Sequence, residues 1–497
     1  MRTIDLKGDE TRAPSRGAAT SNIVAAGMAA KRAREVSITR WRVSRLFLVK
    51  DVVPPSLGTD QNQSAATPGE TAAPGIGRWS ADVEVDVRSP ISLVVFHAMP
   101  LVDQLDHLRA WRPENPNWEG PTREGLAATL QAEVQAHPVC FFENASQFTC
   151  LDPVYLTALV RGFAEGLEGK SVSNWAQFFR FAGWVLDQPD GEIEIRDEFS
   201  GATRLGRRWQ NCRLEIARFL DDALSGKLAS PPLNERASVW RSIEVLTRDP
   251  DPSPSDEVPG SISCMDPYTS SLNTVRGEAL HAVFSFVHWI RSHSREAISG
   301  GKDFDDVPEV RAALEAFLDP QLEHSMAVRS VFGANLPRLA HWAEAWLRSH
   351  IKEIFPAQIQ DASKQAAWDA YLRVSGVDSI ALGLLRQQYA TAIARMPQDR
   401  ALEARCEDST IGLGQHLVVD YCRGSLDLEQ PGCLLAAFLA RASEPVRAAV
   451  LAFVARSLAE LAEPISPDIV ERLLKLWNWQ AQRETTAGGD GSQDEAA

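Results

Sequence analysis

Two short segments contain residue types that bind phosphate in other proteins. Gly169–Ser171 reads Gly-Lys-Ser, which is the end of a phosphate-binding loop. Ala164 stands where that loop needs its first glycine, and the preceding segment has helical periodicity instead of a strand pattern. Gly412–Gly414 resembles the start of a dinucleotide-binding fingerprint, but Leu417 occupies the third glycine position. Both segments are interpreted as helix ends or entries, and we expect no cofactor.

Metal and catalytic motifs are also incomplete. The ten histidines form no HExxH motif and no pair three or four apart with a third ligand nearby; His288 and His293 are five apart and diverge on a helix. Asp303, Asp305 and Asp306 lack the glycine and glutamate of a calcium loop. The chain has no GxSxG nucleophile motif. We therefore expect no metal-binding and no catalytic residues.

Three charged residues lie within apolar helical stretches and are the best candidates for a specific role. Arg276 and Glu278 occur where a helix begins to bury its face, and Arg329 lies within an apolar stripe. The preferred interpretation is a buried ion pair, or an arginine that caps backbone carbonyls, fixing how neighbouring helices stack. The alternative is a contact with an anion or a protein partner in a groove.

These candidates belong to a long series of amphipathic helical segments from about Leu101 to Trp477. The 14 Trp and 19 Phe residues are spread along stripes of helical period, which indicates helix-on-helix packing. Helix pairs recur about every 35 to 45 residues, a spacing typical of helical repeats. The predicted fold is all-α, an irregular α-solenoid or helical-repeat array with a disordered or poorly structured N-terminal segment.

Composition shifts along the chain predict five segments. Four prolines within residues 249–260 exclude a helix there and mark the best internal boundary. The segments are 1–90, basic and largely disordered with at most one or two short strands; 91–248, a first helical subdomain; 249–260, a Pro-rich linker; 261–480, a second helical subdomain; and 481–497, a disordered tail.

Charge and cysteine content restrict the class of protein. Residues 1–50 contain eleven Lys or Arg and four Asp or Glu, which gives them a net charge of +7. Because the whole chain has a net charge of −15, residues 51–497 have a net charge of −22. Such an acidic surface disfavours nucleic-acid binding except through residues 1–50. The seven cysteines include no CxxC pair and indicate reduced thiols of a cytoplasmic protein. No apolar run is long enough to cross a membrane.

Four sequence runs carry a resemblance to a known family. They are Trp118–Leu126, Asn273–Leu280, Ala367–Leu372 and Leu413–Leu417. These runs resemble the helical C-terminal region of large bacterial proteins, in which that region follows a nucleotide-binding module of the signal-transduction ATPase type. Several of those proteins are thought to sense phage in antiviral defence. The resemblance covers roughly residues 89–480 but not the ATPase and effector modules, which implies a split subunit, a truncated gene product or a module that acts in trans.

The expected function is that of a non-catalytic helical scaffold or sensor that binds a protein partner. The resemblance implies a separate ATPase subunit or a phage protein as that partner. The alternatives are an enzyme whose site is assembled across helices, and a nucleic-acid adaptor that uses the basic arm in residues 1–50. The candidate structural or partner-contact residues are Arg276, Glu278, Arg329, Trp368, Tyr371 and His416.

Overall fold

The computed structural model describes residues 88–113, 120–189, 191–196, 203–207, 209–257, 265–293, 303–355, 362–396, 400–459 and 465–489. By their internal contacts the described residues belong to one compact unit. The predictions for residues 1–87, including the basic arm and the short strands, lie outside the described residues. Residues 258–260 and 490–497 also lie outside them.

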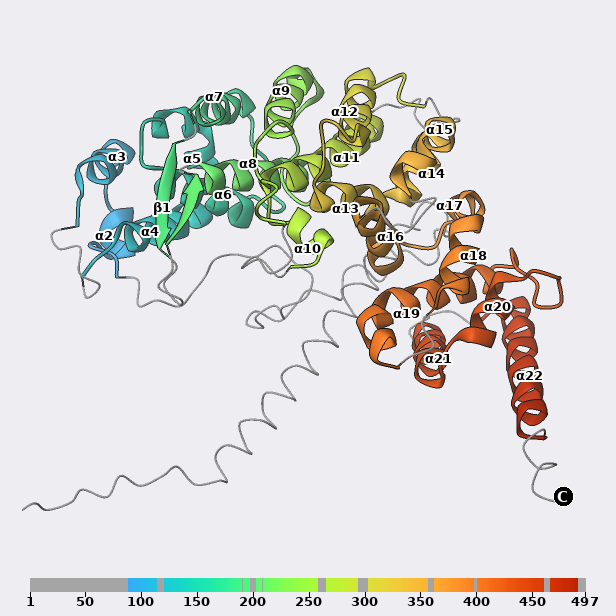
Figure 1. Cartoon of the computed structure of the whole chain (residues 1–497). Coiled ribbons are helices and arrows are strands. Elements are labelled where there is room, and N and C mark those ends of the chain that lie inside the picture. The colour runs from blue at the N-terminus through green and yellow to red at the C-terminus, as the bar shows by residue number, and fades with distance from the viewer. Residues whose placement is uncertain are drawn as a thin grey trace, which may run out of the picture. The chain divides into compact units, whose positions relative to one another are not determined.

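One set of helices forms a continuous series in which each helix packs against the next (Figure 1). We call this set the inner row. Its members are α4 (Arg123–Ala136), α6 (Pro153–Gly166), α8 (Gln210–Leu224), α11 (Val275–His293), α13 (Met326–Ala334), α16 (Ala362–Val374), α19 (Arg400–Cys422) and α21 (Glu444–Ala459). Packing between successive members is the arrangement of a helical solenoid.

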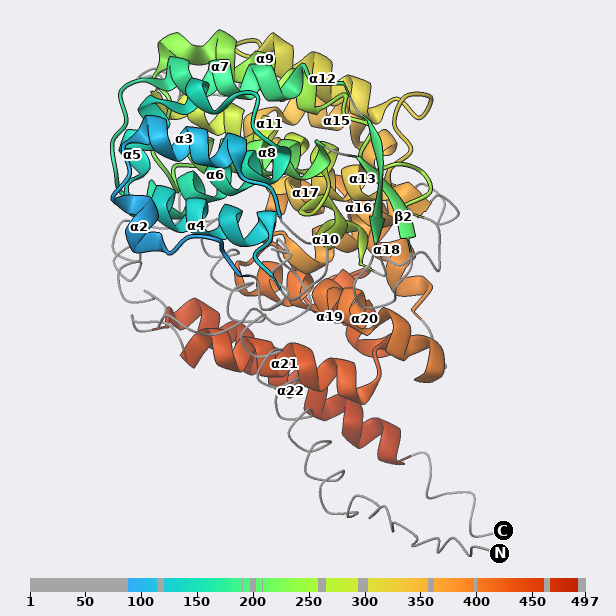
Figure 2. The same cartoon turned by 90° about the vertical axis from the view of Figure 1, so that its left-hand side faces the viewer.

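A second row of helices covers one side of the inner row. Both views place α7, α9 and α12 beside one another and to one side of α8, α11 and α13 (Figures 1 and 2). The second row comprises α5 (Pro138–Glu143), α7 (Trp175–Leu186), α9 (Arg236–Leu246), α12 (Pro308–Leu318), α14 (Leu336–Trp342), α15 (Glu344–Ile354), α17 (Ser379–Leu384), α18 (Arg386–Ala394) and α20 (Leu434–Arg441).

The remaining elements are attached to these rows. Helix α2 packs on α4, α10 on α11 and α13, and α22 on α19. Helix α22 extends into the segment that was predicted to be a disordered tail from residue 481. These elements are α2 (Leu93–His97), α3 (Leu101–Ala110), α10 (Pro267–Ser271), α22 (Pro467–Gly489), and the short 3-10 helices η3 (Ala145–Phe148) and η4 (Leu233–Glu235).

A two-stranded hairpin interrupts the helices between α7 and α8. Strands β1 (Glu192–Arg196) and β2 (Thr203–Arg207) pair antiparallel, with Glu192 opposite Arg207. The sequence analysis did not predict this hairpin, although Glu-Ile-Glu-Ile-Arg alternates with the period of a strand. Apart from the hairpin, the described part of the chain is helical, so the predicted all-α, solenoid-like fold is confirmed.

Side-chain caps determine where several helices begin. Asp152 accepts a hydrogen bond from the Val154 amide (3.2 Å), and α6 begins at Pro153. Helix α4 begins at Arg123, two residues after Pro121. Thr122 is its N-cap, because its hydroxyl accepts a hydrogen bond from the Gly125 amide (3.0 Å).

Aromatic side chains fill the space between the two rows. Phe142 of α5 stacks on Phe178 of α7 and meets the edge of Trp175, with ring centroids 5.5 and 5.0 Å apart. Phe163 of α6 and Phe219 of α8 complete this cluster, and all five side chains are buried. These aromatic residues of the predicted stripes therefore form part of the core. Among the described helices, none is both long and apolar enough to cross a membrane.

Helix α16 lies very close to its neighbours on both sides because they present glycine to it. A Cβ atom on Gly333 of α13 would overlap the carbonyl oxygen of Ala367, and one on Gly412 of α19 would overlap the carbonyl oxygen of Leu372. The rigid backbone on the α16 side cannot yield as a flexible side chain could. These two glycines therefore set the spacing of three consecutive inner-row helices.

We predict that Gly333→Ala separates α13 from α16 and lowers the free energy of unfolding by about 3 kcal/mol. The matched control is Gly183→Ala in α7, where an added Cβ meets no atom within 4 Å. This control should be neutral or more stable by up to about 1 kcal/mol, since alanine favours a helix. Urea unfolding followed by circular dichroism measures both effects, and equal midpoints for the two variants would refute the close-approach argument.

Candidate partner-binding cleft

Arg276 links α11 to the proline-rich segment that precedes it in the chain. Its guanidinium donates to the backbone carbonyls of Asp249 (2.7 Å) and Pro252 (2.9 Å) and to the carboxylate of Glu323 (2.9 Å). The sequence analysis considered an ion pair in which Arg276 and Glu278 take part. Arg276 forms its ion pair with Glu323 instead. Because it also donates to backbone carbonyls, Arg276 has both of the structural roles that were considered, ion pairing and carbonyl capping.

Acidic side chains of the same segment cap the N-termini of two inner-row helices. The Asp251 carboxylate accepts from the Val275 amide (2.7 Å) at the start of α11. The Glu257 carboxylate accepts from the Met326 and Ala327 amides (3.0 and 2.9 Å) at the start of α13. Negative charge at a helix N-terminus is favourable because the first amides lack partners within the helix. These hydrogen bonds attach the segment Asp249–Glu257 to the beginnings of α11 and α13. The division of the chain into two subdomains at residues 249–260 stays a prediction.

A cleft with a volume of about 1680 Å³ lies between α9, α12 and this segment. Its lining comes from α9, from α12 and from the loop that follows α12, which contains Glu323, together with Arg276 of α11. Leu322 is 70% exposed, and it brings a large apolar side chain to the surface of the cleft. Apolar side chains that line the cleft include Trp240, Ala312, Ala316, Phe317, Pro320 and Leu322.

The charged groups of the cleft are mainly acidic. Six carboxylates and three arginines line it, and two further arginines outside the lining, Arg213 and Arg236, pair with Asp249 and Glu309, so one negative charge is in excess. The carboxylates are Glu244, Asp249, Glu257, Glu309, Glu323 and Glu353, and the arginines are Arg248, Arg276 and Arg329. A cleft with this balance attracts positively charged groups.

Arg329 holds the end of α12 at the cleft. Its side chain is almost completely buried, and its Nη2 donates to the carbonyl of Leu318, the last residue of α12, at 2.7 Å. Carbonyls at a helix C-terminus lack partners within the helix, and a cation there is favourable. Arg329 therefore has the carbonyl-capping role that the sequence analysis preferred for the charged candidates.

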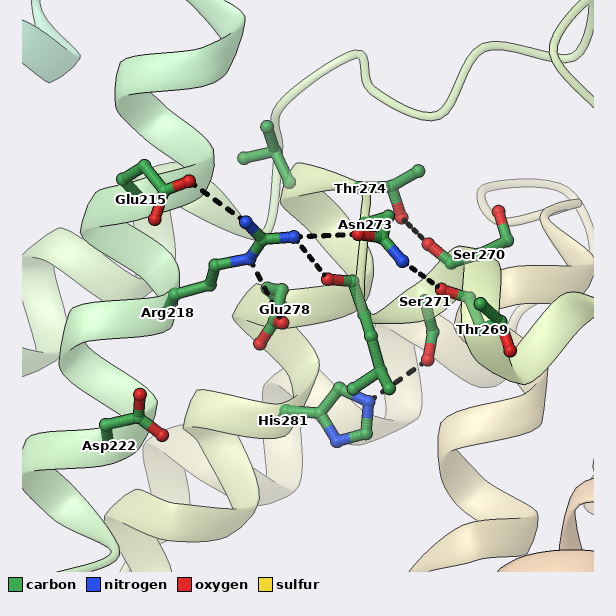
Figure 3. Close-up of polar contacts among 12 residues, drawn as sticks. Glu215, Arg218, Asp222, Thr269, Ser270, Ser271, Asn273, Thr274, Glu278 and His281 are labelled. Carbon is green, nitrogen blue, oxygen red and sulfur yellow. Dashed lines mark hydrogen bonds and ion pairs between the residues drawn. The ribbon is translucent and has the colours of Figure 1, made fainter. Parts of the chain in front are cut away.

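Glu278 takes part in a different network, which joins α8 to α11 (Figure 3). Its fully buried carboxylate lies 3.6 Å from Nε of Arg218. Arg218 also donates to Glu215 (2.9 Å) and to the carbonyl of Leu272 (2.8 Å). Glu215 in turn accepts from Arg161 of α6 (3.1 Å), so the network spans three consecutive inner-row helices.

The other three candidate residues form one buried cluster. The Tyr389 hydroxyl lies 2.7 Å from Nδ1 of His416 and donates to the Tyr371 hydroxyl at 3.1 Å. The His416 ring meets the edge of Tyr371, and Trp368 packs against Tyr389. None of these four side chains is more than 7% exposed. They join α16, α18 and α19, and a partner at the surface would not reach them.

Sequence reasoning missed several residues of these networks. Arg218 carried a usable signal, because it lies between apolar residues of α8 as Arg329 does in α13. The sequence around Tyr389 and Glu323 gave no such signal, because their partners are distant in the chain or because the residue itself lies in a loop. Asp251 and Glu257 were hidden in a proline-rich stretch that has no periodicity.

A scan against protein-family models finds no match, and searches of curated proteins and of solved structures find none either. The resemblance to the helical region of bacterial defence ATPases stays a prediction.

The pH dependence of stability should report on Asp251. Burial raises the pKa of Asp251 to about 6, although the hydrogen bond from Val275 lowers it. The carboxyl group of Asp251 therefore binds its proton more tightly in the folded state than in the unfolded state. Its contribution to the free energy of unfolding is lost as the pH rises from about 4 to about 6. Asp251→Asn should remove that loss, gaining up to about 3 kcal/mol relative to the unmodified protein between pH 4 and pH 7.

Urea unfolding at a series of pH values measures this difference. Asp106→Asn, at a largely exposed carboxylate, controls for the loss of one negative charge. Stability curves that stay parallel for Asp251→Asn and the unmodified protein would exclude a proton held at Asp251.

A second stability prediction concerns Arg218. Arg218→Met leaves Glu278 buried without this guanidinium, and we expect a loss of about 3 to 5 kcal/mol. Adding Glu278→Gln should restore part of that loss, because the buried charge is then removed. Arg248→Met is the control, since its ion pair with Glu244 is exposed and contributes at most about 1 kcal/mol. Similar denaturation midpoints for Arg218→Met and Arg248→Met would contradict the network's role.

Proposed function

We propose that this protein is a non-catalytic helical scaffold that binds a protein partner in the cleft between α9 and α12. The observation that carries the proposal is the combination of an exposed apolar side chain, Leu322, with an acidic surplus in one cleft. Binding sites for peptide segments combine an apolar anchor with charges that select and orient the partner. The matching occupant is a segment with Lys or Arg beside one or two large apolar residues.

The engagement of the cleft carboxylates supports binding over catalysis. Glu257 accepts hydrogen bonds from the start of α13, and Glu323 accepts from Arg276 and from the Ser325 amide (2.8 Å). A general acid or base needs a proton that it can exchange with a substrate. Carboxylates that already hold helices and a guanidinium in place are better suited to fixing the walls of a cleft.

The setting of this function rests on the resemblance alone. We propose a sensor module of a bacterial antiviral system, located in the cytoplasm, whose ATPase half is a separate subunit. Under this proposal the partner in the cleft is a basic segment of that subunit or of a phage protein.

Site-specific photo-crosslinking tests the proposal. A photoreactive amino acid in place of Leu322 should form a covalent adduct with one partner in the organism's own cells, before or during phage challenge. Val102, which is 62% exposed on α3 and does not line the cleft, is the control position. Charge reversal by Glu244→Lys and Glu353→Lys should weaken the interaction by about tenfold.

Mass spectrometry of the adducts decides between the outcomes. A partner that crosslinks at residue 322 but not at 102, and that is lost on charge reversal, supports the scaffold. Equal adducts at both positions, or none at 322 under either condition, would overturn it.

A further inference from the structure

Two histidines and a glutamate meet where α2 packs on α4, away from the cleft. His97 is the last residue of α2, Glu133 lies in the last turn of α4, and His137 follows that helix as its C-cap. Nδ1 of His97 is 2.9 Å from Oε1 of Glu133, and Nε2 of His137 is 3.9 Å from the same oxygen. One donor atom from each residue lies within 4.8 Å of the other two.

The carboxylate in this cluster is buried while both imidazoles reach solvent. The Glu133 side chain is 6% exposed, compared with 56% for His97 and 48% for His137. Within the described part of the chain, Glu133 forms ion pairs only with these two histidines. A buried carboxylate is unfavourable without a compensating cation. An imidazole supplies positive charge only when it is protonated, whereas a bound metal ion supplies it when both imidazoles are neutral.

The donor set and its spacing suit a transition metal. Two imidazole nitrogens and one carboxylate oxygen form a ligand set of zinc sites, with the remaining position taken by water. Tetrahedral zinc at its usual bond lengths separates neighbouring donors by about 3.3 Å. The two nitrogen–oxygen distances of 2.9 and 3.9 Å lie on either side of this value, and the two imidazole nitrogens lie within 4.8 Å of each other. The two imidazoles stack with ring centroids 4.8 Å apart, which keeps both rings beside Glu133.

We propose that His97, Glu133 and His137 bind one Zn²⁺ ion, which fastens α2 to α4 and leaves a coordination position open to solvent. The sequence analysis expected no metal site because the histidines form no metal-binding motif, and His97 is 36 residues from Glu133 in the chain. The remaining pair, Glu133 and His137, shares a helical face at a spacing of four residues but provides only two ligands.

Metal titration of the full chain tests this site. Metal-free protein should bind one equivalent of Zn²⁺ in isothermal titration calorimetry, and the ion should raise the thermal midpoint. The double variant His97→Ala/His137→Ala should lose at least about 100-fold in affinity and show no thermal shift. Bound Co²⁺ should give the intense visible absorption of a four- or five-coordinate site in the unmodified protein only.

Two further variants keep the result interpretable. Glu133→Gln preserves the shape of the side chain but removes its charge, and it should also weaken Zn²⁺ binding. His341→Ala removes an exposed histidine outside the cluster and should leave binding unchanged. Circular dichroism without metal confirms that each variant is folded. Absence of Zn²⁺ binding by the unmodified protein, or an affinity that is the same in the double variant, would overturn the proposal.

Discussion

Each interior helix of the inner row is packed between two neighbours, so its buried polar side chains must find their partners inside the protein. Burying a charge without such a partner has a desolvation free energy that exceeds the stabilisation from the packing around it. Arg218 meets this constraint with carboxylates from α8 and α11, and Arg329 meets it with the last carbonyl of α12. His416 of α19 meets it with Tyr389 of α18. These bonds specify which helices lie side by side, in addition to the apolar contacts that only require burial.

The cleft depends on the same constraint. Arg276 and Glu257 fasten the segment after α9 to the beginnings of α11 and α13. That segment forms part of the cleft lining, so the bonds that hold the helices also hold the proposed binding surface. A surface that is rigid before binding loses less conformational entropy when a partner arrives. Under the proposed function, a partner would meet walls that these bonds already hold in place.

The helical fold could be predicted from the sequence because its signals are local. Apolar residues at spacings of three and four, Asp152 before Pro153, and the proline-rich break after α9 each act within one helix or one loop. The partners of the charged candidates could not be predicted in this way. Glu323 lies in the loop after α12, and Tyr389 meets His416 from another helix. A single sequence contains periodicity but gives no distances between helices. It therefore indicated that Arg276 and Glu278 would have polar partners, but it did not identify Glu323 and Arg218 as those partners.

The order of contacts in the inner row also bears on how the protein is made. Each inner-row helix packs mainly on members that come shortly before and after it in the chain. Such low contact order favours fast folding, and repeat arrays can extend from one folded end. On the ribosome, α4, α6 and α8 can pack while α16 and α19 are still being translated. The solenoid can therefore form in the direction of synthesis, with each new helix covering the apolar face that the previous one left exposed.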